Sequence, residues 1–405
     1  MIEGLYIHVP FCDGKCHYCA FYSVPYRREL ASDWLGNLRR EMEAAIAEFG
    51  PLSPSTIFFG GGTPTLLPMD QLEQLLDLIR ISTVRRSEPQ RDAEHADEEK
   101  NKNSPRLRSW RSSAVPSLQL DDVKPFEWSC EANPGSLDSA KLELLKSAGV
   151  NRISLGVQSL DDGVLRQLGR RHTARDVHSA VAAIRRAGYD NWGLDLIACV
   201  PGVDVAAWRK TLQAAVALEP RHISVYALTS EEGTRLARDA ASGTVTLLDD
   251  DEQLAMLDTA EEVLEAAGLL RYEISNYARP GFECRHNCSC WRGGDYLGLG
   301  PAASSRVGNR RWTNGTANLT RQEERLSPLT DATERLVFGL RMTEGIDLDA
   351  ILAASGLADA SQEQVWRATL ERLQAEGVLV HEGSRWRLTK RGRALADYVA
   401  VELMP

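Results

Sequence analysis

Three cysteines near the start of the sequence are the residues best suited to do chemistry. Cys12, Cys16 and Cys19 follow the pattern C-x₃-C-x₂-C. Clustered thiolates are the usual ligands of iron–sulfur clusters, and three of them can hold three corners of a cubic cluster. The fourth iron is then open to another ligand. The spacing therefore predicts a [4Fe–4S] cluster with one open iron.

Buried apolar cysteines, a zinc site and disulfides are the alternatives to a cluster at this triplet. Free cysteines are often small buried apolar residues, and zinc sites usually have four protein ligands arranged in pairs. A disulfide framework needs an oxidising compartment and usually a small chain. Met1 leads directly into a strand-like run, with no charged and apolar leader that would indicate export. We therefore expect a cytoplasmic protein whose eight cysteines stay reduced.

Bulk properties exclude several classes of protein. The chain has 405 residues, which leaves room for more than one domain. Its 43% hydrophobic and 26% charged residues are ordinary for a globular protein, and no apolar run is long enough to span a membrane. The formal charge of −10 argues against nucleic acid as the main partner.

Six strand-like runs, each followed by helix-like sequence, are expected to position the cysteines. The predicted strands are 5–9, 56–60, 128–131, 152–155, 191–197 and 222–226. The amphipathic stretches between them include 31–48, 71–81, 140–147, 174–187 and 206–218. This alternation predicts an α/β fold with a parallel sheet and right-handed crossovers. In such sheets the ligands lie at the carboxyl ends of the strands.

The residues suited to chemistry fall at those carboxyl ends. The cysteines follow the first strand, and the glycine run 60–64 follows the second. Glu131 ends the third strand, Gln158 follows the fourth and Asp195 lies within the fifth. Glycine lets the backbone approach a ligand closely, so the run 60–64 is a candidate part of the site.

Two regions depart from the βα pattern. Residues 85–125 combine low hydrophobicity with dense mixed charge, which predicts a disordered insertion. We assign residues 1–318 to a core with its extension and residues 319–405 to a second domain. The expected elements of this second domain are helices at 333–339 and 361–376, strands at 378–381 and 386–389, and a further helix.

This order predicts a winged-helix-like α+β domain. Winged helices often bind DNA, but a fold does not fix a function. The basic stretch 385–393 is short, and such patches are usually solvated faces. A DNA-binding regulator is thus a minor alternative, and we expect a structural or protein-contact role for this domain.

Several motifs carry a resemblance to a known family. The chain resembles the radical S-adenosylmethionine (SAM) proteins related to oxygen-independent coproporphyrinogen oxidase, over nearly its whole length except 85–125. The matching segments are 6–12, 59–65, 131–134, 154–159, 193–197, 272–277 and 285–287. The resemblance implies a partial (β/α)₆ barrel in which SAM occupies the open iron. It also implies that a reduced cluster can pass one electron to SAM.

The resemblance further implies which residues contact SAM. These are Tyr6, Gly62, Thr63, Glu131, Gln158, Arg170 and Asp195, with Tyr18 beside the adenine. Carboxylates suit amine or hydroxyl groups, and a guanidinium suits a carboxylate. Judged without the resemblance, Tyr6 could be plain strand core and Arg170 a solvated surface charge.

Two features indicate the heme-chaperone branch of the family rather than the oxidase. The oxidase carries a fourth cysteine where this sequence has Phe21, and it has a longer N-terminal segment, whereas this sequence starts at its first strand. A heme-associated motif, H-N-x-x-Y-W, is matched by His286, Asn287 and Trp291, with Cys290 in place of the tyrosine. Histidine and thiolate are both axial heme ligands. His286 is therefore our candidate heme ligand.

We thus expect a protein that binds heme and carries it to acceptors such as membrane respiratory enzymes, without inserting into the membrane. A radical SAM enzyme acting on a tetrapyrrole is the alternative. Cys284, Cys288 and Cys290 could form a second metal site, but we prefer buried thiols, as for Cys130 and Cys199. The sequence is compatible with a homodimer but does not indicate whether one forms.

Overall fold

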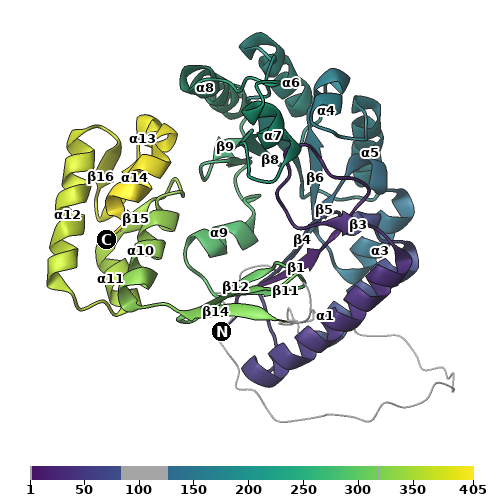
Figure 1. Cartoon of the computed structure of the whole chain (residues 1–405), viewed down its shortest axis with the longest axis horizontal. Coiled ribbons are helices and arrows are strands. Elements are labelled where there is room, and N and C mark those ends of the chain that lie inside the picture. Colours follow the sequence, from purple (N-terminus) through teal and green to yellow (C-terminus); the bar gives the residue numbers. More distant parts are fainter. Residues whose placement is uncertain (1, 84–125, 317–319) are drawn as a thin grey trace, which may run out of the picture.

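A computed structural model describes residues 2–83, 126–316 and 320–405. The insertion expected at 85–125 lies outside the described residues. The model shows a strand-and-helix core beside a smaller C-terminal module (Figure 1).

Six parallel strands form the centre of the core. They are β1 (Gly4–Val9), β4 (Thr56–Gly61), β5 (Glu127–Ala132), β6 (Arg152–Gln158), β7 (Trp192–Ala198) and β8 (His222–Ala227). They lie side by side in that order and pair in parallel throughout. The predicted partial (β/α)₆ barrel is thereby confirmed.

Helices cover the outer side of these strands (Figure 1). They are α1 (Arg28–Phe49), α2 (Met69–Ser82), α3 (Ser139–Ala148), α5 (Ala174–Arg186), α6 (Val205–Ala217) and α8 (Asp250–Ala266). The short helices α4 (Asp162–Gln167) and α7 (Arg235–Ala241) lie near the loop that carries the cysteines. The apolar residues of α2 at helical spacing, such as Leu72 and Leu75, are buried in the core. Gly149 after α3 has a φ of 106°, a left-handed conformation that glycine adopts at helix ends.

Alternation along the strands explains why polar groups gather inside the barrel. Successive side chains of a strand point to opposite faces. In β1, Leu5 and Ile7 are buried in the main apolar core, whereas Tyr6 and His8 lie on the other face. The same alternation places Glu131 and Asp195 on the inner face of β5 and β7.

The sheet extends beyond the six strands at both edges, giving twelve strands in all. Beyond β1 lie β11 (Tyr296–Leu299), which is parallel to it, and the antiparallel β12 (Ser304–Val307), β13 (Arg310–Asn314) and β14 (Arg321–Arg325). Beyond β8 lie β10 (Asn276–Ala278) and β9 (Leu270–Arg271). No strand of this extension was predicted from the sequence.

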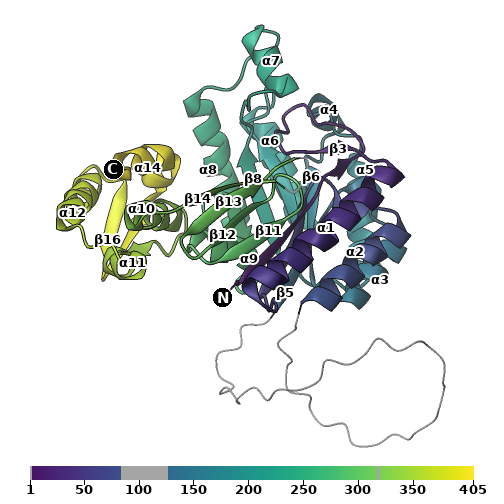
Figure 2. The same ribbon diagram turned by 60° about the horizontal axis from the view of Figure 1, so that its bottom comes forward.

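The C-terminal module has the predicted winged-helix order. Its elements are α10 (Pro328–Gly339), β15 (Ile346–Asp347), α11 (Leu348–Ser355), α12 (Ala360–Ala375), β16 (Leu379–Glu382), β17 (Arg385–Leu388), α13 (Lys390–Ala394) and α14 (Ala396–Leu403). Its three strands are antiparallel in the order β15-β17-β16. Leu336, Trp366, Leu370 and Val399 belong to a core of its own, and Figure 2 shows the module at one side of the barrel.

The basic stretch of this module pairs within the chain. Arg393 contacts Glu261 of α8 at 2.5 Å, and Lys390 contacts Asp258 at 3.2 Å. These ion pairs hold α13 against the barrel. They also engage basic side chains that would otherwise be available to DNA phosphates.

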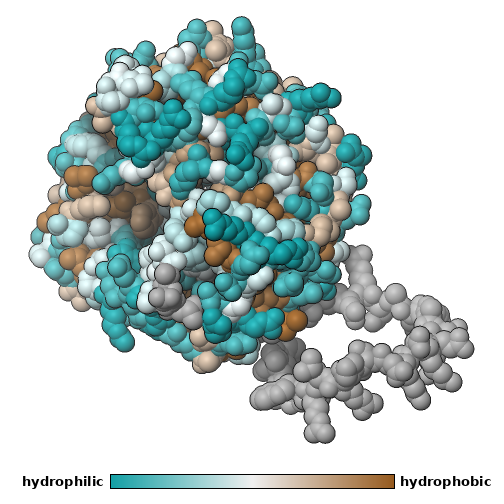
Figure 3. Space-filling model, turned by 45° about the vertical axis from the view of Figure 1, so that its right-hand side comes forward, coloured by the Kyte–Doolittle hydropathy of each residue, from teal (hydrophilic) through white to brown (hydrophobic). Residues whose placement is uncertain are grey.

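One face of the molecule is mainly polar. The face in Figure 3 is a mosaic of mostly hydrophilic side chains with small separate hydrophobic patches. Within the described ranges, no helix has both the length and the apolar character needed to cross a membrane.

Candidate functional site

The three cysteines lie on a loop that begins at the carboxyl end of β1. Cys12 ends the short strand β2 (Phe11–Cys12), and Cys16 and Cys19 lie between it and β3 (Val24–Pro25). The two short strands pair in parallel and close the base of the loop. All three thiols are free and half-buried.

This donor set fits an iron–sulfur cluster. Among the described residues, no three His, Cys, Asp or Glu side chains converge on a single metal ion. Burial raises the pKa of the Cys12 and Cys19 thiols, and metal coordination is what deprotonates such thiols. A cavity of about 320 Å³ lies beside Cys16 and Cys19.

The glycine run 60–64 is hydrogen-bonded to the loop that carries the three cysteines (the cluster loop). The backbone N–H groups of Gly62 and Thr63 donate to the carbonyl oxygens of Val9 and Phe11, each at 2.8 Å. A Cβ atom at Gly62 would lie only 2.6 Å from the carbonyl oxygen of Phe11. Only glycine therefore allows this approach of the two loops.

Thr63 connects this loop to the third strand. Its hydroxyl lies 3.8 Å from the Cys12 Sγ and accepts a 2.7 Å hydrogen bond from Asn133 Nδ2. Asn133 was not predicted as a site residue, although it stands two positions after Glu131 in the matching segment 131–134.

Arg170 points into the site and is not a solvated charge. Its Nη1 lies 3.4 Å from the Cys16 Sγ, and its Nη2 donates to Asn133 Oδ1 at 2.5 Å and to the Gly156 carbonyl at 2.7 Å. Its Nε is buried without a partner among the described residues. A buried N–H without a partner is costly, so this atom indicates a ligand or water beside it.

Gln158 and Tyr18 lie beside Arg170. Gln158 ends β6 after a register shift and has a φ of 67°, which is uncommon outside glycine. A Cβ at Gly156 would meet Gln158 Nε2 at 3.2 Å and Arg170 Nη2 at 3.5 Å. Burial raises the pKa of Tyr18, while Arg170 lowers it.

Two carboxyl groups face the barrel interior. Glu131 Oε2 accepts a 3.2 Å hydrogen bond from the Gly61 N–H. Asp195 Oδ1 accepts from Ser224 Oγ at 2.7 Å and from Ser154 Oγ at 3.2 Å. Burial and the charge of Asp195 raise the pKa of Glu131 to about 8, and burial raises the pKa of Asp195. Such a pair favours a cationic or hydroxyl-bearing ligand.

We expect SAM affinity to rise with pH because of Glu131. Below a pKa of about 8 its carboxyl is mostly neutral, so binding to the ionised form weakens by up to about tenfold per pH unit. Equilibrium dialysis of cluster-loaded protein between pH 6.5 and pH 8.5 measures this. Glu131→Gln is expected to bind more weakly with a flatter profile. An unchanged slope in that variant would assign the titration to another group.

Tyr6 begins a chain of hydrogen bonds to the cluster loop. Its hydroxyl lies 3.2 Å from His8 Nδ1, and His8 Nε2 lies 2.9 Å from the carbonyl oxygen of Tyr22. A carbonyl can only accept, so His8 carries its proton on Nε2 and Tyr6 donates to Nδ1. Burial raises the pKa of Tyr6, which keeps it a neutral phenol.

His286 lies at the opposite end of the strands from the cysteines. It belongs to α9 (Arg285–Trp291), and its Nδ1 is 2.9 Å from the hydroxyl of Thr56, the first residue of β4. Its ring stacks on Phe58 at 5.3 Å and is 6% exposed. Burial lowers its pKa to about 4. Among the predicted SAM residues, Tyr6 lies near His286, with 6.5 Å between the two ring centroids.

The other cysteines are mainly buried. Cys130, Cys199, Cys284 and Cys288 are buried, and Cys290 is half-buried. Burial raises the pKa of the three α9-region thiols, Cys284, Cys288 and Cys290. Their burial favours the interpretation that they are thiols within the core and not ligands of a second metal site.

The serine partners of Asp195 were missed by the sequence analysis. Ser224 stands opposite Asp195 in the pairing of β8 with β7. Its inward position follows from strand alternation once the register is known, but the sequence contains no signal for that register.

Comparisons with known proteins agree with this geometry. Residues 6–215 match the model of the radical SAM superfamily, and residues 326–395 match the HemN C-terminal domain. The solved structure of coproporphyrinogen III oxidase (HemN) from Escherichia coli superposes with a TM-score of 0.78. The match covers 100% of this chain and 90% of the HemN chain at 20% sequence identity, which shows a similar fold. The fold and the site thus define a radical SAM protein.

Curated relatives narrow the class. The heme chaperone HemW of Mycobacterium tuberculosis (strain H37Rv) is 33% identical over 99% of this chain and 94% of its own. That of Bacillus subtilis is 30% identical over 98% of both chains. The chain therefore belongs to the radical SAM superfamily and, within it, to the HemW family. Membership of the superfamily implies a [4Fe–4S] cluster and SAM.

Proposed function

We propose that the protein is a heme chaperone, which binds heme and passes it to heme-accepting proteins such as respiratory enzymes. The observation that carries this proposal is the similarity to heme chaperones over nearly the full length of both chains. We also propose that it works in the cytoplasm, where the cluster thiols stay reduced.

In this proposal Cys12, Cys16 and Cys19 hold the cluster, and the surrounding residues hold SAM. When bound, these two groups supply one-electron chemistry. Arg170 offers a guanidinium for the SAM carboxylate, and Glu131 and Asp195 offer carboxylates for its amine and hydroxyl groups. Gly62 lets the glycine run after β4 approach the cluster loop closely enough to support the cysteines.

Phe21 supports the chaperone assignment. It stands where the oxidase has its fourth cysteine, and its side chain is 69% exposed. Lys15 Nζ donates to its carbonyl oxygen at 2.5 Å, which fixes the backbone at this point of the loop. The position therefore presents an exposed aromatic ring in place of a thiol.

For heme, we propose His286 as an axial ligand through Nε2. In this structure the Nδ1 of His286 is held by Thr56, which leaves Nε2 as the nitrogen for ligation. Because the ring is buried, heme binding would require α9 to shift. This helix packs on the C-terminal module, where Trp291 contacts Phe338 at 6.0 Å between ring centroids.

Heme titration of the purified protein tests the proposal. We expect saturation at about one heme per chain and a loss of affinity of about tenfold or more in His286→Ala, because an axial ligand is removed. His178→Ala, on the exposed face of α5, is the matched control and should bind normally. Circular dichroism distinguishes lost ligation from unfolding. Failure to take up stoichiometric heme would count against the chaperone.

A radical enzyme acting on a tetrapyrrole is the second candidate. The arrangement of Arg170, Glu131 and Asp195 around the cysteines favours it, because it offers partners for the carboxylate, amine and hydroxyl groups of SAM. An anaerobic assay with SAM, a reductant and coproporphyrinogen III decides between the two. Turnover with release of 5′-deoxyadenosine would favour the enzyme, and none is expected for the chaperone.

A further inference from the structure

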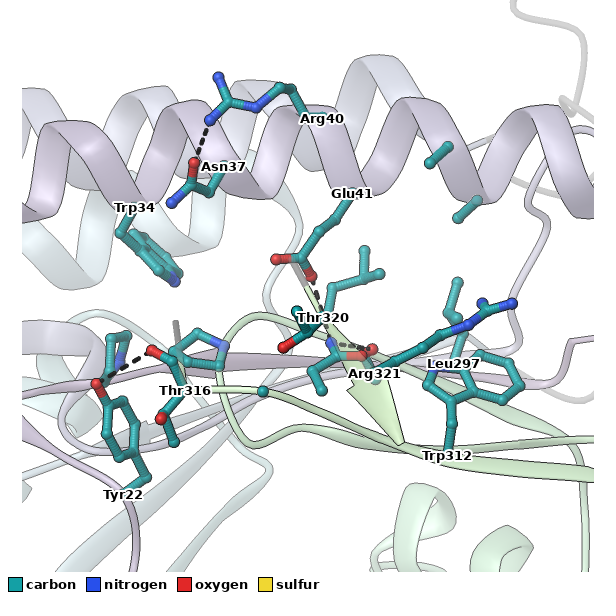
Figure 4. A pocket seen from close by; sticks show the side chains of 18 of the residues that line it. Tyr22, Trp34, Asn37, Arg40, Glu41, Leu297, Trp312, Thr316, Thr320 and Arg321 are labelled. Carbon is teal, nitrogen blue, oxygen red and sulfur yellow. Dashed lines mark hydrogen bonds between the residues drawn. The ribbon is translucent and has the colours of Figure 1, made fainter. Parts of the chain in front are cut away.

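A second cavity lies between α1 and the extension of the sheet, apart from the SAM residues. Its volume is about 380 Å³, within the range of small-molecule pockets. Helix α1 forms one wall and β11 and β13 form the other, as Figure 4 shows. The cluster loop closes one end with Phe11, Tyr22 and Val24.

Aromatic rings form much of the lining. At the end near the cluster loop, Trp34 meets Phe11 edge-on, with 5.7 Å between ring centroids. At the other end, Phe49 and Trp312 stack at 6.1 Å with an angle of 8° between their planes. Arg310 and Arg321 already lie over the Trp312 ring, 5.4 and 5.1 Å from its centroid. The aromatic surface that a flat apolar occupant would meet is therefore at the Trp34 end.

Trp34 presents a hydrogen-bond donor without a partner. Its side chain points from α1 into the cavity (Figure 4), and the residue is 6% exposed. Its Nε1 is buried and has no hydrogen-bond partner among the described residues. A buried N–H without a partner is costly, so an acceptor on an occupant would be favourable here.

Glu41 presents an acceptor two helical turns from Trp34, on the same face of α1. Both hydrogen bonds that it accepts, from the Gly300 N–H at 2.7 Å and Asn314 Nδ2 at 3.4 Å, go to Oε2. Within the described part of the chain it forms no ion pair. Burial accordingly raises its pKa. Its Oε1 is thus the atom that a cationic occupant would meet.

The arginines of the cavity wall already have partners. Arg40 donates to Asn37 within α1. Arg321 pairs with Glu48 at 3.3 Å and with Glu323 at 2.8 Å. The partner of Arg40 is a neutral amide, and the carboxylate of Asp33 also lines the cavity, but both of these residues are exposed. Among the described lining residues, Glu41 is thus the half-buried carboxylate without an ion pair.

We propose that this cavity binds a small arylalkylamine. Its ring would lie beside Trp34 and Phe11 at the end near the cluster loop, a hydrogen-bond acceptor on the ring would meet Trp34 Nε1, and its ammonium group would meet Glu41 Oε1. The Cα positions of Trp34 and Glu41 lie seven residues, or about 10 Å, apart along α1, a spacing comparable to the length of a phenol ring with a two-carbon ammonium chain. Heme is a poor occupant because its carboxylates would face Glu41.

The occupant would touch the loop that carries the cluster. The carbonyl of Tyr22 accepts the hydrogen bond from His8, which connects the cavity wall to Tyr6 in the SAM site. The site is nevertheless independent of heme binding, and its test does not rest on the chaperone assignment.

Isothermal titration of the full-length, cluster-loaded protein with tyramine tests this proposal. We expect saturable binding at one site, weakened at least tenfold in Glu41→Gln and several-fold in Trp34→Phe, which keeps a ring but removes the N–H. Glu43→Gln, on the exposed face of α1, is the matched control and should bind normally. 4-Hydroxyphenylacetate, with a carboxylate in place of the ammonium, should not bind.

Three results would overturn the proposal. They are the absence of saturable tyramine binding, equal binding in Glu41→Gln and the wild-type protein, and displacement of tyramine by stoichiometric hemin. Circular dichroism of each variant excludes unfolding as the cause of a lost signal.

Discussion

Replacing Cys12, Cys16 and Cys19 together by alanine is expected to remove the cluster completely. Wild-type protein reconstituted anaerobically should contain about four irons per chain, and the triple variant should contain almost none above background. SAM should then lose its anchoring iron, so its binding should fall by at least tenfold. Iron analysis and the visible absorption spectrum measure the first effect, and equilibrium dialysis measures the second.

A second triple variant provides the matched control. Replacing Cys284, Cys288 and Cys290 by alanine alters thiols near the amino ends of β1 and β4, far along the barrel from the cluster loop. We expect full iron content from reconstitution without heme. A loss of iron in this control, or four irons in the first variant, would show that the cluster ligands are assigned wrongly.

Gly62→Ala is expected to have the next largest effect. Its added Cβ would lie 2.6 Å from the Phe11 carbonyl and 2.7 Å from the Val9 carbonyl. Because both are backbone atoms, the glycine loop must move away from the cluster loop. We expect SAM binding to fall by at least tenfold, and the free energy of unfolding to drop by about 1–3 kcal/mol, as for an overpacked site.

Gly36→Ala is the control for this substitution. Gly36 lies within α1 with open space around its added Cβ, and alanine is favoured over glycine in a helix by about 1 kcal/mol. This variant should bind SAM normally and unfold at the same or a higher temperature. Normal SAM binding in Gly62→Ala would contradict this account. It would mean that the glycine loop can move away from the cluster loop without weakening the SAM site.

Much of the barrel was predictable because its physical signals are local. Buried parallel strands read as short apolar runs, and helices such as α2 bury residues at a spacing of three and four. The strands 56–60 and 222–226 were each predicted to within one residue of β4 and β8. Residues just after parallel strands gather at one edge, so the cysteines and Thr63 could be placed near each other.

The remainder depends on contacts between distant segments. The strands β13 and β14 are rich in arginine and glutamate and pair through ion pairs such as Arg310 with Glu323, a pattern without apolar alternation. The burial of His286 under β4 arises only when α9 packs against Thr56 and Phe58. The hydrogen bonds of Arg170 to Asn133 and Gly156 likewise form only in the folded barrel.

Transfer of heme is the most direct test of the central claim, that this radical SAM protein is a heme chaperone. Protein with its cluster reconstituted is loaded with one equivalent of heme and mixed anaerobically with the heme-free form of a heme protein. We predict that the absorption spectrum of the acceptor appears faster than from a non-specific carrier such as heme-loaded albumin. Transfer no faster than from the carrier, or retention of all the heme, would contradict the account.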